Sequence, residues 1–80
     1  MDAWLFELTF DYEDGTEPNT ETLGIFNDLG QALRTAQTFC KGDCEIVFDG
    51  RGYIYRISGV RGVCKILVTL TGFNFNEIVG

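Results

Sequence analysis

The amino-acid sequence predicts an α+β fold in which an antiparallel β-sheet of five or six strands carries one α-helix on one face. Three observations support this prediction. Residues 3–12 alternate in polarity, as a half-buried strand does. Residues 29–41 instead place apolar side chains at helical spacing. Residues 44–71 consist of short apolar runs separated by glycine-rich turns, which is typical of antiparallel strands.

The first strand is expected at residues 3–12, which are rich in aromatic side chains. Residues 13–20 are polar and contain two turn signals, Asp-Gly and Pro-Asn. A second, shorter strand is therefore expected at residues 21–26. The apolar face of the first strand would consist of Trp4, Phe6, Leu8, Phe10 and Tyr12.

A single helix is expected at about residues 29–41. Asp28 is a suitable N-cap, and Gln31 stands at the position that completes a capping box. Lys41 and Gly42 suit the end of the helix, because a cation is favourable there and glycine commonly terminates helices. The side chains expected to face the sheet are Leu29, Ala32, Leu33, Ala36, Phe39 and Cys40.

The remainder of the chain has the pattern of a β-meander, which completes the order ββαβββ. Gly72 would interrupt the last strand, so that residues 73–76 either continue it beyond a bulge or form a sixth strand. One helix covers only one face of such a sheet, and the other face is solvated or meets a partner. Strands are expected at residues 44–48, 53–58 and 63–71, with tight turns at residues 49–52 and 59–62.

The chain of 80 residues is expected to form a single domain over residues 1–80. Hydrophobic residues make up 45% of it, which suffices for one packed core and excludes a disordered acidic tail. No apolar run approaches the roughly 20 residues of a membrane helix. The residues after Met1 lack the basic start of a signal peptide. We therefore expect a cytoplasmic protein with no membrane partner.

The sequence predicts neither an enzyme nor a protein with a metal or other cofactor. Histidine is absent, which removes the most common general base and a common metal ligand. The one serine, Ser58, thus has no histidine to activate it. A structural zinc site needs four ligands, whereas the cysteines are three: Cys40, Cys44 and Cys64. These thiols are interpreted as core or incidental residues, with metal binding or redox chemistry as the alternative.

Residues 51–57 resemble the RNP1 strand of RNA-recognition motifs through an Arg-Gly pair followed by Tyr53 and Tyr55. Ile54 and Arg56 depart from that pattern, and the net charge of −6 opposes phosphate binding. No direct binding of nucleic acid is therefore expected. The two tyrosines are expected on one strand face, which would be an interaction surface if it is exposed.

Residues 11–15 resemble the start of a calcium-binding loop, because carboxylates precede a glycine at short spacing. The fifth loop position is Gly15, however, and the twelfth is Thr22 instead of the required glutamate. A solvated hairpin loop is expected here.

Acidic residues are concentrated in the first part of the chain. Residues 1–33 contain eight of them and no lysine or arginine, whereas residues 34–80 contain six basic and four acidic residues. Protein surfaces usually mix both signs, so this segment is either a solubilising surface or a docking face for a protein with a basic groove. Carboxylates along a strand and loop can imitate a nucleic-acid backbone and accelerate association. The expected partner-binding residues are Glu7, Asp11, Glu13, Asp14, Glu17 and Glu21.

In size, acidity, lack of a catalytic set and expected architecture, the chain resembles the small inhibitors encoded by phages and mobile elements, such as anti-CRISPR proteins. That group shares no motif, so the resemblance assigns no role to any residue. It implies a non-enzymatic protein that sterically blocks a host nucleoprotein complex, such as a CRISPR effector subunit, in the host cytoplasm. The alternative is an oligomerising structural or regulatory domain that pairs through a sheet edge at residues 73–79. Both a monomer and a homodimer remain open.

Overall fold

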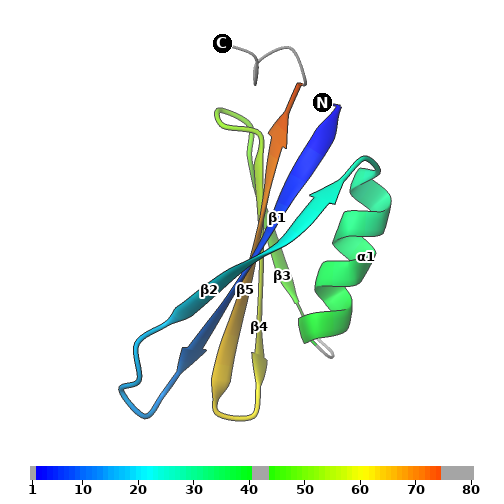
Figure 1. The fold of residues 1–80 in the computed structure, drawn as a ribbon. Helices are drawn as coiled ribbons and strands as arrows, with labels where there is room; N and C mark the ends of the chain where they lie inside the picture. Colours follow the sequence, from blue (N-terminus) through cyan, green and yellow to red (C-terminus); the bar gives the residue numbers. More distant parts are fainter. Residues whose placement is uncertain (1, 41–43, 75–80) are drawn as a thin grey trace.

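The alternating and helical patterns of the sequence produce one five-stranded sheet and one helix in a computed structural model that describes residues 2–40 and 44–74 (Figure 1). The strands follow the order β2-β1-β5-β4-β3 across the sheet, and every neighbouring pair is antiparallel. The predicted α+β fold and the element order ββαβββ are thus confirmed. The elements are β1 (Ala3–Tyr12), β2 (Asn19–Phe26), α1 (Leu29–Cys40), β3 (Glu45–Asp49), β4 (Ile54–Arg61) and β5 (Cys64–Phe73).

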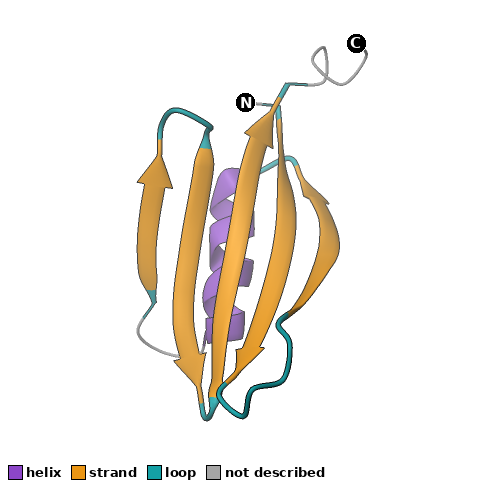
Figure 2. Ribbon diagram, turned by 90° about the vertical axis from the view of Figure 1, so that its left-hand side faces the viewer, coloured by secondary structure: helices purple, strands orange, loops and turns teal. Residues whose placement is uncertain are grey.

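The helix lies against one face of the sheet, as Figure 2 shows from the opposite side. We call this face the helix face and the other the open face. Alternate residues of β1, β4 and β5 point to the helix face, where burying their apolar surface supplies the main stabilisation. On the helix face, the side chains that are at most 2% exposed are Phe6, Leu8, Ile57, Ile66, Val68 and Leu70 from the sheet, with Ala32, Ala36 and Cys40 from the helix.

Asp28 is the N-cap of α1, as the sequence predicts. The Asp28 carboxylate accepts a hydrogen bond of 3.0 Å from the backbone N–H of Gly30, which satisfies one of the free donors at the helix start. The predicted apolar stripe is confirmed, since its remaining members, Leu29, Leu33 and Phe39, pack against the core. The expected terminating residues 41 and 42 lie outside the described residues. In the described part of the chain, no helix is long and apolar enough to cross a bilayer.

The expected turn at residues 59–62 is wrong, because β4 continues through this segment to Arg61. The actual turn consists of two residues, Gly62 and Val63, with Arg61 paired to Cys64. Gly62 has a φ of +66°, which glycine adopts without steric cost in tight hairpins. Gly59 stays in the strand because its lack of a side chain makes room for the helix. A Cβ atom there would lie 2.9 Å from the Cβ of Cys40.

Gly72 does not interrupt the last strand, which is a second correction. It pairs with Trp4 of β1, and its backbone N–H donates a hydrogen bond of 2.8 Å to the carbonyl oxygen of Tyr53. A large aromatic side chain opposite a glycine covers the space that the glycine leaves. The strand therefore continues to Phe73, while residues 75 and 76 lie outside the described residues.

Candidate functional site

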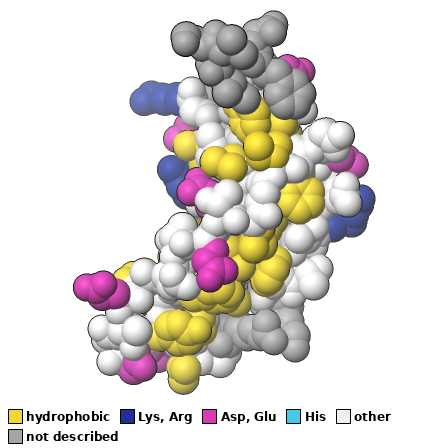
Figure 3. Space-filling view, viewed as in Figure 1, with side chains coloured by type: hydrophobic (Ala, Val, Ile, Leu, Met, Phe, Trp, Pro, Cys, Tyr) yellow, Lys and Arg dark blue, Asp and Glu magenta, His cyan; other side chains and the backbone are white. Residues whose placement is uncertain are grey.

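The acidic residues around the β1–β2 connection form the main candidate site. Asp11 stands near the end of β1, and Glu13, Asp14 and Glu17 lie in the connection, residues 13–18. All four side chains are exposed. Figure 3 shows acidic side chains gathered at this tip of the molecule, at the lower left of the view. We call these four residues the acidic hairpin end.

Two of the expected partner-binding residues do not join the acidic hairpin end. Glu7 lies four residues before Asp11 in β1, about 13 Å away along the strand, and is only half-exposed. Glu21 is exposed in β2 but pairs with Leu8, which places it on the helix face, whereas Glu7 and Asp11 point to the open face. Of the six expected partner-binding residues, four therefore lie at the hairpin end and two lie elsewhere on the sheet.

The hairpin end is not purely acidic, because the fold brings other groups beside it. Lys65 of β5 lies directly opposite Asp11. The backbone N–H of Glu13 donates a hydrogen bond of 3.2 Å to the carbonyl of Val63, which joins the hairpin to the β4–β5 turn. The Val63 side chain is 68% exposed and that of Tyr12 42%. An apolar and cationic fringe therefore accompanies the carboxylates, and the sequence analysis missed it because Val63 and Lys65 are far from Asp11 along the chain.

Asp14 is held in its charged form by the turn that follows it. Its carboxylate accepts hydrogen bonds from the hydroxyl of Thr16 and from the Thr16 backbone N–H, the latter at 3.0 Å. These bonds, the hydroxyl first, lower the pKa of Asp14 from its usual value because they favour the carboxylate. The turn thus presents a fixed negative charge at the tip of the molecule.

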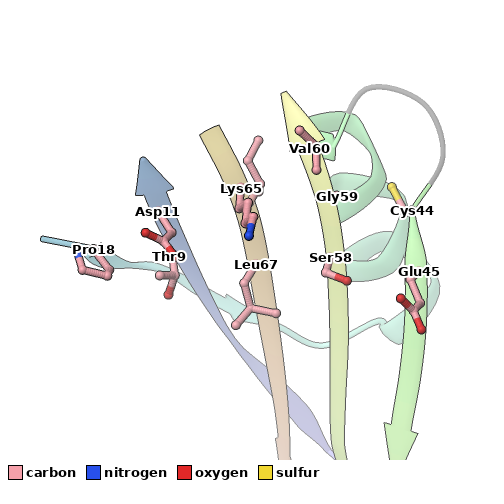
Figure 4. A pocket seen from close by; sticks show the side chains of 11 residues that line it. Thr9, Asp11, Pro18, Cys44, Glu45, Ser58, Gly59, Val60, Lys65 and Leu67 are labelled. Atoms are coloured by element: carbon pink, nitrogen blue, oxygen red, sulfur yellow. The ribbon is translucent and has the colours of Figure 1, made fainter. Parts of the chain in front are cut away.

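A hollow of about 820 Å³ crosses the open face next to the hairpin end. Figure 4 looks onto it with α1 behind the strands, and Asp11, Lys65 and Glu45 approach it from three different strands. Ser58 also lines it, but the chain has no histidine to activate that hydroxyl. The lining offers hydrogen bonds and ionic contacts to a bound group. No cluster of three or more potential metal ligands occurs within residues 2–40 and 44–74.

The thiol of Cys40 belongs to the core. Its side chain is almost completely buried at the end of α1, beside Gly59. Burial, followed by its interaction with the neighbouring Cys44 thiol, raises the pKa of Cys40 to about 11. Since the thiolate is the nucleophile, a thiol that stays protonated at neutral pH is a poor one.

We expect Cys40 to remain unmodified when the native protein is treated with iodoacetamide at pH 8, and to react once the chain is unfolded in urea. The raised pKa also has a consequence for stability. From the reference value of 9.0 upwards the unfolded chain ionises first, so the free energy of unfolding falls between pH 9 and about pH 11. The decrease should be smaller in Cys40→Ala, measured by urea denaturation at each pH. Equal slopes for both proteins would contradict the assignment.

The two tyrosines of the RNP1-like segment do not share a strand face. Tyr53 precedes β4 in a turn with a φ of +51°, and its side chain is exposed. Tyr55 points to the helix face and packs edge-on against Trp4, with ring centroids 5.5 Å apart. The positive φ of Tyr53 ends the alternation on which the sequence prediction relied. The segment therefore offers no paired aromatic platform on which bases could stack.

A sheet edge was expected at residues 73–79, and the structure describes residues 73 and 74 of this segment. The expectation is wrong for Phe73. Phe73 ends β5, which lies between β1 and β4 in the interior of the sheet. Its carbonyl accepts a hydrogen bond of 3.0 Å from the backbone N–H of Asp2. Residues 75–79 lie outside the described residues. In the described sheet the outer strands are β2 and β3.

Comparison with known proteins found no protein family, no curated protein and no solved structure that matches this chain.

Proposed function

We propose that this chain is a non-enzymatic binding protein that blocks a basic groove of a nucleic-acid-binding partner with its acidic hairpin end. The observation that carries the proposal is the exposure of Asp11, Glu13, Asp14 and Glu17 at one tip of the sheet. Like-signed charges at a protruding tip attract an oppositely charged groove over several ångströms and steer association. The resemblance to phage-encoded inhibitors makes a CRISPR effector in the host cytoplasm the first partner to test.

Apolar side chains beside the hairpin end support binding that goes beyond electrostatic attraction. Tyr12 and Val63 would contact apolar walls of a groove once the carboxylates have entered it. Asp14 adds a charge that its turn already holds in place, so little freedom is lost on binding. These features favour a docking surface over a surface that only confers solubility.

The test reverses the charge of the hairpin end in the variant Asp11→Lys/Glu13→Lys/Asp14→Lys/Glu17→Lys. Purified CRISPR effector complexes are each incubated with fluorescent target DNA, and displacement of the DNA is followed by anisotropy. We expect the wild-type chain to displace DNA from at least one effector, and the variant to bind that effector at least roughly tenfold more weakly. Raising the salt concentration should weaken the wild type more than the variant.

A pair of variants with equal net charge separates position from total charge. Glu13→Lys/Glu17→Lys changes the hairpin end, whereas Asp2→Lys/Glu21→Lys makes the same charge change at two exposed sites outside it. Only the first pair should weaken displacement strongly. Unchanged displacement by the quadruple variant at physiological salt, or no displacement of DNA from any effector by the wild type, would refute the proposal.

A further inference from the structure

Among the described strands, β3 is an outer strand of the sheet. It pairs with β4, and no described strand pairs with its other side. Four consecutive residues, Glu45, Ile46, Val47 and Phe48, are exposed. An exposed outer strand presents a row of backbone N–H and C=O groups on which a further strand can form.

The opposite outer strand, β2, is protected in ways that β3 is not. Pro18 precedes it, and its pairing with β1 is interrupted by a register shift at Phe6 and Glu7. Gly24 lies at this irregularity with a φ of +150°. Prolines and bulges are devices by which proteins prevent strand addition. Residues 45–49 contain no proline, glycine or lysine and pair with β4 in regular register.

The two faces of β3 differ in chemistry. Ile46 and Phe48 pair with Ile57 and Tyr55, so they lie on the helix face, where 43% and 49% of their side chains remain exposed. The Phe48 ring packs against Tyr55 at a centroid distance of 4.5 Å, which fixes its position at the border of the sheet. An added strand would gain apolar burial here.

On the open face, the same strand presents charge. Glu45 and Asp49 flank Val47, and all three alternate with the apolar pair on the other face. The nearest cation in register is Arg56, opposite Val47 in β4. One cation against two carboxylates leaves this border negative.

We propose that β3 is a docking edge for an extended segment of another protein, which adds as a sixth strand and carries basic residues on one side and apolar residues on the other. The basic residues would lie opposite Glu45 and Asp49 on the open face. The apolar residues would cover Ile46 and Phe48 on the helix face. Main-chain hydrogen bonds supply affinity in such strand addition, and the alternating side chains supply specificity.

The charges also distinguish this occupant from a second copy of the chain. Two antiparallel copies of β3 centred on Val47 would place Glu45 of each copy opposite Asp49 of the other. Like charges directly opposite each other destabilise a strand pair, whereas opposite charges stabilise it. A strand with basic residues therefore pairs more favourably along the whole of β3 than a second copy of β3 does.

The probe is a capped peptide with the sequence Lys-Val-Thr-Val-Lys, and the control peptide has glutamate in place of both lysines. Hydrogen exchange of the full chain is followed by NMR with each peptide at up to about 1 mM, the range of weak binding. We expect the lysine peptide to slow exchange in residues 45–49 and to leave β2 unaffected. The glutamate peptide should have a smaller effect.

Reciprocal charge variants complete the test. In Glu45→Lys the affinity for the lysine peptide should fall roughly two- to fivefold, and that for the glutamate peptide should rise by a similar factor. The control Glu13→Lys makes the same charge change at the hairpin end. It should change the affinity for the lysine peptide and for the glutamate peptide by less than roughly twofold.

Three results would overturn the proposal. The first is no protection of β3 by the lysine peptide, and the second is protection of β2 or the hairpin end instead. The third is a concentration-dependent dimer in light scattering whose β3 amides are already protected without peptide, since the occupant would then be a second copy. The first and third results do not involve the acidic hairpin end, so this inference and the proposed function can fail separately.

Discussion

Replacing Phe6 with alanine is expected to lower the free energy of unfolding by about 3–5 kcal/mol, because a whole aromatic ring is lost from the core. Phe6 is completely buried in the middle of β1. Its ring packs against Phe26 of β2 and Phe39 of α1, with centroid distances of 5.3 and 6.2 Å. One side chain thus joins the sheet edge, the sheet centre and the helix, and its removal leaves a cavity between three elements.

The expected loss is large for a chain of this size. Domains have free energies of unfolding of roughly 0.05–0.15 kcal/mol per residue, which corresponds to roughly 4–12 kcal/mol for this chain. Urea denaturation followed by circular dichroism measures the change in the free energy of unfolding. The dependence of this free energy on urea concentration should have the same slope in both proteins. Phe48→Ala is the matched control, because its ring is half-exposed, and it should cost less than half as much. A loss below about 1 kcal/mol for Phe6→Ala would contradict the described core.

Gly59→Ala is expected to destabilise the protein by about 1–3 kcal/mol, although alanine normally favours the folded state over glycine. The added Cβ would lie 2.9 Å from the Cβ and 3.1 Å from the Sγ of Cys40. The Cβ of Cys40 is fixed by the helix backbone and cannot rotate away. The end of α1 must therefore move outwards, which should also make the Cys40 thiol accessible to iodoacetamide.

The control for this substitution is Gly50→Ala in the exposed β3–β4 turn. There the added Cβ would meet only the Phe48 ring, at an ordinary contact distance of 3.5 Å. Its change in the free energy of unfolding should stay within about 0.5 kcal/mol. If Gly59→Ala is as stable as the wild type and its Cys40 remains unreactive, the close contact between α1 and β4 is not as described.

The acidic residues of the candidate site could be predicted from the sequence, but their arrangement in space could not. The sequence concentrates acidic residues before position 34, and an Asp-Gly pair places some of them in a hairpin loop. The sequence does not show on which face of the sheet each residue lies. A register shift at Phe6 and Glu7 places Glu21 on the helix face, whereas Glu7 points to the open face. Sequence distance likewise concealed Lys65, which the pairing of β1 with β5 brings opposite Asp11.

The turn predicted at residues 59–62 and the strand interruption predicted at Gly72 were wrong for a common physical reason. Glycine favours turns when the local sequence is considered alone. Gly59 instead occupies a strand where Cys40 of α1 lies against it, and Gly72 occupies a strand where it pairs with Trp4 of β1. The correct turn at Gly62 is the one where the backbone itself needs a positive φ.

By itself, the sequence determined the elements whose periodicity spans many residues. The apolar alternation of β1 and the helical stripe and N-cap of α1 act between near neighbours, so local patterns suffice to predict them. The tertiary structure alone decided the strand order, the register and the identity of the outer strands. These depend on contacts between residues far apart in the chain, whose energies no local pattern contains. Such contacts also decided that β2 and β3 are the outer strands of the described sheet, that Phe73 lies in an inner one, and that four of the expected partner-binding residues share one tip.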